Sequence, residues 1–224
     1  PLLLIVACVT TPVTNREAFI LIPFEQEVAL GAQAYKEMTS KEKESTDPRL
    51  NEVVRRVAKR IAAVSDMPDL NWEFKLIESN VQNAFCAPGG KVVVYTGILP
   101  VAANEAGLAA VLGHEVAHAI ARHGAQRLSQ QLLIQGALGV AAVSMTSKNR
   151  NVILGALGLG ATVGLALPFS RMNESEADEI GVVYMARAGY DPSEAMKFWQ
   201  RFSAQKGSGK PPEFLSTHPS HGTR

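Results

Sequence analysis

The sequence is poor in cysteine, in aromatic residues and in net charge. Its two cysteines are too few for a zinc-ribbon pattern, and they allow one disulfide without requiring it. Lysine and arginine total 22 against 21 acidic residues, and no basic stripe interleaved with aromatic side chains occurs, which argues against nucleic-acid binding. No internal repeat is evident. The 224 residues suit one domain, or one domain with a tail, and suffice for a sizeable core.

The N-terminus has no apolar run long enough to cross a bilayer. Residues 2–9 are apolar, but a spanning helix needs about 20 such residues. The letters "IVAC" match a bacterial lipobox that ends at Cys8, and residues 10–18 have the composition of a tether. We therefore expect a lipoprotein signal remnant and tether over residues 1–22, with Cys8 acylated and Cys86 unpaired. The alternative is a buried first strand. The remaining residues, 23–224, are expected to form one folded domain.

Beyond residue 23 the pattern is mostly helical. An apolar stripe of Val28, Ala32 and Tyr35 marks the first helix, and Asp47-Pro48 is a start signal for the second. Apolar and charged residues then alternate as in a strand, and a Pro-Gly-Gly turn separates two extended runs. The pattern predicts helices within residues 23–46, 46–66, 104–124, 171–192 and 193–205, and strands within residues 71–79 and 83–97.

Two runs rich in glycine and alanine follow the third helix, over residues 132–145 and 152–169. The first is too short to cross a bilayer and the second is borderline. We expect a pair of buried helices, with a membrane hairpin or an interfacial pair as the alternative.

The helix predicted over residues 104–124 carries the stretch "GHEVAH". It has Asn104 as its N-cap and Gly124 just past its end. His114 and His118 lie four residues apart and therefore on one face, where both imidazoles can bind one Zn²⁺. Glu115 lies beside them as a general base that does not bind the metal. His123 lies about 140° further round a continuous helix, so it is not expected to join the metal.

A catalytic zinc ion requires a third protein ligand and one open position. The stretch "NESEADEIG" supplies acids near the start of a helix, and on geometry alone Glu174 is favoured only modestly over Glu176. Small residues beside Glu174 would let this helix approach the histidine helix closely. Asp178, one turn further on, is expected to accept the N–H of a ligand histidine.

Four motifs together resemble metallopeptidase family 48, of the HtpX and BepA/LoiP type. They are "GHEVAH", "NESEAD", "NAFCAPGGKVVVYTGIL" and "STHPS", and the resemblance covers residues 24–224. It implies an α+β fold, mostly helical, of the zincin (gluzincin) kind, with a small β-sheet or hairpin beside the HExxH helix. It also implies one Zn²⁺ per chain, with Glu174 as the third ligand and Asp178 as its supporting acid.

The same resemblance implies a role for the hairpin and for the C-terminal tail. The strand "KVVVYTG" would be an edge strand that pairs with an extended substrate. Its substrate-binding residues would be Asn83, Ala84, Val93, Val94 and Tyr95. His218 would donate a hydrogen bond to the oxyanion or cap the zinc in a resting state, and His221 and Arg224 are weaker candidates for the same role.

These features predict a zinc-dependent endopeptidase that acts on damaged or misassembled envelope proteins, with Glu115 and His218 as its catalytic residues. The lipobox predicts anchoring to a membrane of the bacterial periplasm through Cys8, with the outer membrane favoured because Val9 follows it. Envelope assembly machinery is a further partner in this interpretation. The alternatives are an envelope chaperone or assembly lipoprotein that retains the zinc fold, and a membrane-embedded protease of the HtpX kind. The intact Glu115 argues against the chaperone.

Overall fold

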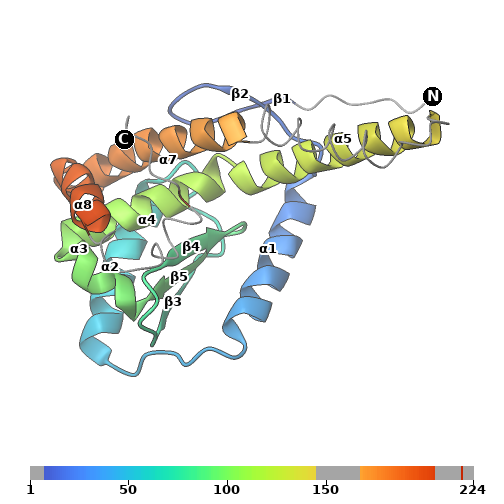
Figure 1. The fold of residues 1–224 in the computed structure, drawn as a ribbon. Helices are drawn as coiled ribbons and strands as arrows, with labels where there is room; N and C mark the ends of the chain where they lie inside the picture. Colours follow the sequence, from blue (N-terminus) through green and yellow to red (C-terminus); the bar gives the residue numbers. More distant parts are fainter. Residues whose placement is uncertain (1–7, 145–166, 205–217, 219–224) are drawn as a thin grey trace.

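The computed structural model describes residues 8–144, 167–204 and 218. A three-stranded sheet lies at its centre, with helices around it (Figure 1). The central strand β5 (Lys91–Tyr95) is parallel to β3 (Glu73–Ile77) on one side and antiparallel to β4 (Ala84–Ala87) on the other. The predicted hairpin is therefore confirmed, and its turn contains Gly89 and Gly90, both with positive φ. The predicted α+β, mostly helical fold is also confirmed.

Helix α2 (Pro48–Val64) begins where the sequence predicts, because the Asp47 side chain accepts hydrogen bonds from the backbone N–H groups of Arg49 and Leu50. Helix α1 (Phe24–Thr39) also forms, and Tyr35 of the predicted stripe is buried, whereas Val28 is half-buried and Ala32 is exposed. The buried face of α1 consists of Glu27, Gly31, Tyr35 and Thr39.

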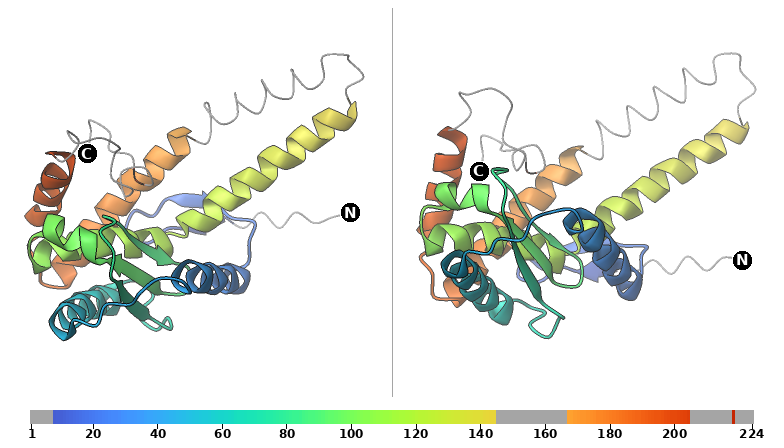
Figure 2. Two further views of the ribbon diagram at one scale, coloured as in Figure 1. Left: turned by 60° about the horizontal axis from the view of Figure 1, so that its bottom comes forward. Right: turned by 90° about the horizontal axis from the view of Figure 1, so that it is seen from below.

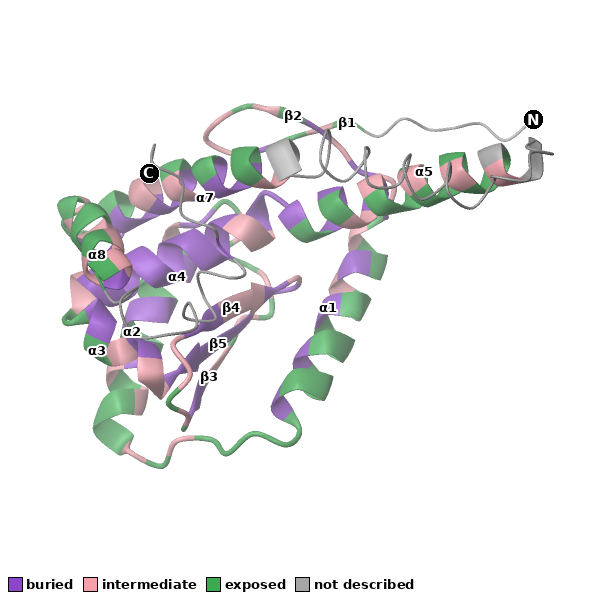
Figure 3. Cartoon of the chain, in the orientation of Figure 1, coloured by how far each residue is buried: buried purple, intermediate pink, exposed green. Residues whose placement is uncertain are grey.

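A 3₁₀ turn, η1 (Thr96–Ile98), and the short helix α3 (Leu99–Ala102) lead from the sheet to helix α4 (Glu105–Ile120). Asn104 caps α4 as predicted, by accepting the N–H of Gly107. Nearly all of α4 is buried (Figure 3), because it is enclosed by the sheet, α2 and α7. Its end was predicted wrongly: the helix stops at Ile120, Arg122 adopts a φ of 58°, and Gly124 lies inside the next helix.

Helix α7 (Leu167–Arg187) runs beside α4, and α8 (Ser193–Ala204) closes that end of the molecule. The contact between α4 and α7 is close because glycine meets glycine: a Cβ atom on Gly113 would lie 2.8 Å from the carbonyl oxygen of Gly181. Small residues thus allow the approach that the sequence predicts. In α8, Phe198 and Phe202 are buried, whereas Met196 is exposed.

The first described residues form a hairpin of β1 (Cys8–Thr10) and β2 (Glu17–Phe19), which lies against α7 and the start of α5 (Figure 1). Thr11, Ala18 and Ile20 are buried in this contact. The prediction of a tether over these residues is therefore wrong, because side chains that read as polar linker residues bind partners on the folded domain.

Helix α5 (His123–Ser144) projects away from the body of the molecule (Figure 2). Leu132, Leu133 and Val140 are exposed on it, so the expectation of a buried helix is wrong for this first glycine-rich run. Most of the second run, residues 152–166, lies outside the described residues. Among the described helices none is by itself long and apolar enough to cross a membrane; the bent pair Thr96–Ala102 and Glu105–Ile120 meets that criterion by length and composition only.

Candidate metal centre

Four side chains from three parts of the chain converge at one point. His114 and His118 come from α4, Glu174 from α7, and His218 from the C-terminal part of the chain. The Nε2 atoms of the two α4 histidines lie 3.1 Å apart. Glu174 Oε1 lies 3.3 Å from His118 Nε2, and Glu174 Oε2 lies 3.4 Å from His114 Nε2. The motifs "GHEVAH" and "NESEAD" therefore lie next to each other in the folded chain.

His218 completes the group. Its Nδ1 lies 3.2 Å from His114 Nε2 and 3.1 Å from Glu174 Oε2, and its ring is buried. One potential ligand atom from each of the four residues lies within 4.8 Å of the others. The structure thus brings His218 to the site, in the position of a fourth ligand.

The spacing of these atoms fits a tetrahedral zinc ion. Bonds of about 2.0–2.2 Å to nitrogen and oxygen place neighbouring ligand atoms about 3.3–3.6 Å apart, close to the 3.1–3.4 Å seen here. The histidine tautomers support the same conclusion. His114 Nδ1 lies 2.9 Å from the Asp178 carboxylate, to which it donates, so His114 Nε2 presents a lone pair to the centre. Such a cluster of lone pairs and a carboxylate fits a cation.

Each α4 histidine has a second partner behind it. Asp178 contacts His114 as predicted, and the Trp199 ring packs edge-on against His114 at 5.5 Å between centroids. Behind His118 lies His123, whose Nδ1 is 2.8 Å from His118 Nδ1. His123 is not in the group of potential metal ligands, as expected, but its separation from the site was overestimated because the helix breaks before it.

The electrostatics of the group follow from burial and from the neighbours. Burial alone would raise the pKa of the Glu174 carboxyl, but its contacts with His114 and His218 hold that pKa far below its ordinary value. Burial and the neighbouring His114 lower the pKa of His118. Burial opposes charge on His114 too, yet Asp178 and Glu174 raise its pKa. Glu174 is therefore ionised and His118 neutral, which are the states that bind a metal.

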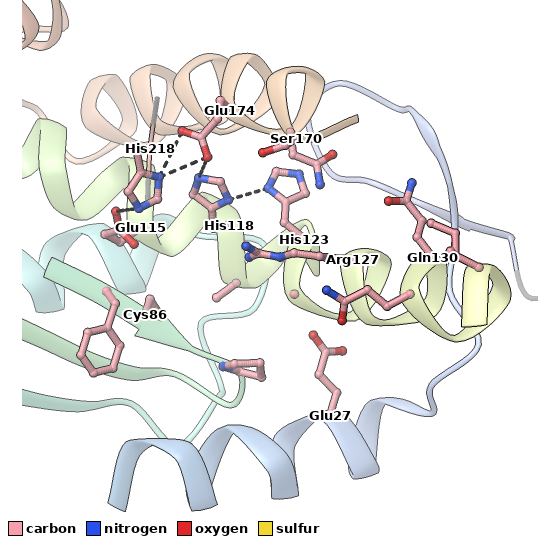
Figure 4. A pocket seen from close by; sticks show the side chains of 17 residues that line it. Glu27, Cys86, Glu115, His118, His123, Arg127, Gln130, Ser170, Glu174 and His218 are labelled. Atoms are coloured by element: carbon pink, nitrogen blue, oxygen red, sulfur yellow. Dashed lines mark hydrogen bonds and ion pairs between the residues drawn. The ribbon is translucent and has the colours of Figure 1, made fainter. Parts of the chain in front are cut away.

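The centre opens into a cleft of about 380 Å³ (Figure 4). Glu115 lines this cleft beside the four converging side chains, with its Oε1 atom 3.4 Å from His218 Nε2. Phe85, Cys86 and Pro88 line it from the sheet, and burial raises the pKa of the Cys86 thiol, which keeps it protonated. Residues of α5 form the far wall. A carboxylate beside a metal centre in a cleft is the arrangement of a metallopeptidase.

Comparison with known proteins places this arrangement in a family. The model of peptidase family M48 matches residues 45–224, which is most of the chain. This chain belongs to peptidase family M48. The family and the metallopeptidase class predicted from the four motifs are thereby confirmed.

The M48 chain is similar to mitochondrial metalloendopeptidases and to bacterial beta-barrel assembly-enhancing proteases. It is 41% identical to the mitochondrial metalloendopeptidase OMA1 of Schizosaccharomyces pombe, over 93% of this chain and 62% of that protein. It is 31% identical to the beta-barrel assembly-enhancing protease of Yersinia pestis, over 93% of this chain and 44% of that protein. Human mitochondrial OMA1 is 29% identical over 96% of this chain and 44% of its own length. The chain thus spans less than two thirds of these relatives.

The prediction of a location in the bacterial periplasm is wrong. The relatives from S. pombe, Saccharomyces cerevisiae, Arabidopsis thaliana and human are mitochondrial proteins by name, and the first of them is considerably more similar than the bacterial proteases. The lipobox match was a short pattern of common apolar and small residues. In the structure Cys8 lies in strand β1 and pairs with Phe19.

The prediction that the strand "KVVVYTG" lies at the edge of the sheet is also wrong. Strand β5 lies between β3 and β4, so the backbone of Val93, Val94 and Tyr95 is already paired on both sides. Among the described strands, β4 is the edge that faces α4. Asn83 and Ala84, which were expected to contact substrate, do not line the cleft, whereas Phe85 and Cys86 do.

The contacts that three residues make beside the M48 centre were not predicted from the sequence. Glu176 was considered and placed second to Glu174, His123 was set aside, and Arg16 lies in the supposed tether. Glu176 accepts hydrogen bonds from both Arg16 and His123. The only signal in the sequence was the second acid of the "NESEAD" motif, because Arg16 lies 160 residues away from it.

Proposed function

We propose that this M48 domain is a zinc-dependent endopeptidase with His114, His118 and Glu174 as zinc ligands and Glu115 as general base. The convergence of His114, His118 and Glu174 on one point, with Glu115 beside them in the cleft, is the observation that carries the proposal. The ligand set of two histidines and one glutamate is that of catalytic zinc sites, which keep a further position for water or substrate.

Bound zinc would supply Lewis-acid polarisation of the scissile carbonyl and a water nucleophile of lowered pKa. Glu115 would accept a proton from the attacking water and deliver a proton to the leaving amine. Asp178 holds His114 through its Nδ1–H, which leaves His114 Nε2 directed at the centre. Glu174 stays ionised because its neighbours hold its pKa down.

Strand β4 binds the substrate in this proposal. Tyr95 donates to the carbonyl of Asn83, so by the alternation of an antiparallel pair the backbone groups of Ala84 and Cys86 point to the free edge. The Ala84 N–H is occupied by the Asn83 side chain at 2.9 Å, which leaves the Cys86 N–H and C=O as the central partners. An extended peptide that pairs there lies between β4 and the ligand helix α4.

His218 acts in this proposal as a displaceable fourth ligand. It occupies the position that a catalytic zinc keeps open, so the conformation described here is a resting state. The geometry favours this role over that of an oxyanion donor, because the same nitrogen of His218 contacts both Glu174 and His114.

We also propose a mitochondrial location and damaged or misassembled membrane-associated proteins as substrates. Support comes from the names of the relatives, which are mitochondrial metalloendopeptidases and an assembly-enhancing protease. The exposed apolar residues of α5 are typical of a surface that contacts a membrane or another protein.

The test is to purify the chain and measure its zinc content and its cleavage of casein, alongside Glu115→Gln and Glu174→Ala. We expect Glu115→Gln to retain zinc and to lose about 10²–10⁴ in rate, which is the contribution of a general base. Glu174→Ala should lose zinc and activity together. Full activity of Glu115→Gln would refute the mechanism, and full zinc content of Glu174→Ala would refute the ligand assignment.

A further inference from the structure

The two histidines of α4 are supported differently. His114 donates directly to a carboxylate, that of Asp178, at 2.9 Å. His118 instead contacts a second histidine, His123, at 2.8 Å between the two Nδ1 atoms. His123 in turn lies 2.9 Å from Glu176 Oε2 through its Nε2 atom. His123 and Glu176 are only 1% and 5% exposed, so water does not compete for these contacts.

One arrangement of protons satisfies this chain of contacts. His118 Nε2 faces Glu174 and His114, so the proton of neutral His118 sits on Nδ1 and is donated to His123 Nδ1. His123 then carries its own proton on Nε2 and donates it to the Glu176 carboxylate. The order is fixed because a carboxylate at the far end can only accept.

The carboxylate at the end of this chain is held by the N-terminal hairpin. Arg16 Nε donates to Glu176 Oε2 at 2.9 Å, Thr11 Oγ1 donates to Glu176 Oε1 at 2.6 Å, and Thr14 donates to the same oxygen. Arg16 also donates to Gln126 on α5 at 2.9 Å. The hairpin lies before residue 45, where the match to the family begins.

We propose that His123, Glu176 and Arg16 are positioning residues that hold His118 in the orientation and tautomer for metal binding, so that docking of the hairpin over residues 8–19 sets the metal affinity. The proposal rests on the zinc site of the proposed function. A ligand histidine is oriented and made more basic by the acceptor of its second N–H. Here that acceptor is a neutral histidine, which can accept only while Glu176 fixes its proton on the opposite nitrogen.

The test measures zinc affinity of the full chain by competition with a chromophoric chelator. Glu176→Gln, His123→Phe and Arg16→Met should each bind zinc about 10- to 100-fold more weakly, the loss typical of outer-sphere partners. The double variant of His123→Phe and Glu176→Gln should bind no more weakly than His123→Phe alone, because Glu176 acts through His123.

Two controls on α7 separate this effect from charge and from stability. Glu179→Gln removes the same charge from an exposed position three residues further on, and Tyr184→Phe removes the hydrogen bond that the buried Tyr184 donates to Asp66. Both should bind zinc like the wild type. Equal losses in Tyr184→Phe and Glu176→Gln would overturn the proposal, as would additive losses in the double variant.

Folding and the proposed function are tested separately. Thermal melts of the metal-free proteins show whether each variant is folded, and Thr14→Val, which removes one hydrogen bond to Glu176, gives a milder variant with a smaller expected loss. If the wild type binds no zinc, the proposed function fails. If the wild type binds zinc and folded Glu176→Gln and Thr14→Val bind it equally well, only the positioning role is refuted.

Discussion

Replacing His218 by alanine should raise the peptidase activity. The His218 ring occupies the fourth position of the metal group and must leave before a substrate carbonyl can enter. Its contacts within the site are to Glu174 at 3.1 Å, to His114 at 3.2 Å and to Glu115 at 3.4 Å. His218 therefore also restrains Glu115, the proposed general base.

The size of the increase follows from these contacts. The two ring nitrogens of His218 make one polar contact each, Nδ1 with Glu174 or His114 and Nε2 with Glu115. At about 0.5–1.5 kcal/mol each, these contacts stabilise the closed state by about 1–3 kcal/mol. The open state would then be populated at about 1–15%, and the apparent kcat/KM falls to about 1–15% of its value for the open state. His218→Ala should thus cleave casein about 5-fold to 100-fold faster than the wild type at saturating zinc.

The assay compares initial rates and zinc content for the wild type, His218→Ala, and His218→Ala combined with Glu115→Gln. The combined variant should be inactive, which shows that the added activity arises at this site. A tenfold or larger fall in the activity of His218→Ala with zinc retained would refute the reasoning, since His218 would then take part in the reaction.

Two further predictions concern the support of the site. Gly181→Ala should lower stability by about 1–3 kcal/mol and weaken zinc binding, because its Cβ would lie 2.8 Å from the backbone nitrogen of His114 and force α7 away from α4; thermal melts check this, with Gly136→Ala in open space on α5 as the harmless control. As the pH is lowered below about 5, the wild type should lose stability more steeply than Glu176→Gln. Although burial opposes charge on Glu176, hydrogen bonds from His123 and Arg16 lower its pKa in the folded state, so its stabilisation is present above its unfolded pKa and is lost as the pH falls; parallel slopes in melts at pH 7 and pH 4 would contradict this.

The convergence of His114, His118 and Glu174 could be predicted because it depends on helical spacing and on motif residues. His114, Glu115 and His118 share one helix, and "NESEAD" places Glu174 and Asp178 one turn apart on another. The order of strands could not be predicted in the same way. A β-branched run such as that of β5 is typical of a strand, but it does not reveal whether that strand is central or at an edge, which depends on pairing with β3 across intervening residues.

The missed role of His123 has one physical origin, the break between α4 and α5. The 140° separation from His118 holds only for a continuous helix, whereas Arg122 adopts a φ of 58° and turns the chain. A left-handed conformation costs a non-glycine residue about 1–2 kcal/mol. Arg122 offsets this cost by donating to Glu27 at 2.6 Å and to the Ile22 carbonyl at 2.9 Å, both buried contacts. These partners lie 95 and 100 residues earlier, so the turn that brings His123 against His118 is specified by tertiary contacts and not by the local sequence.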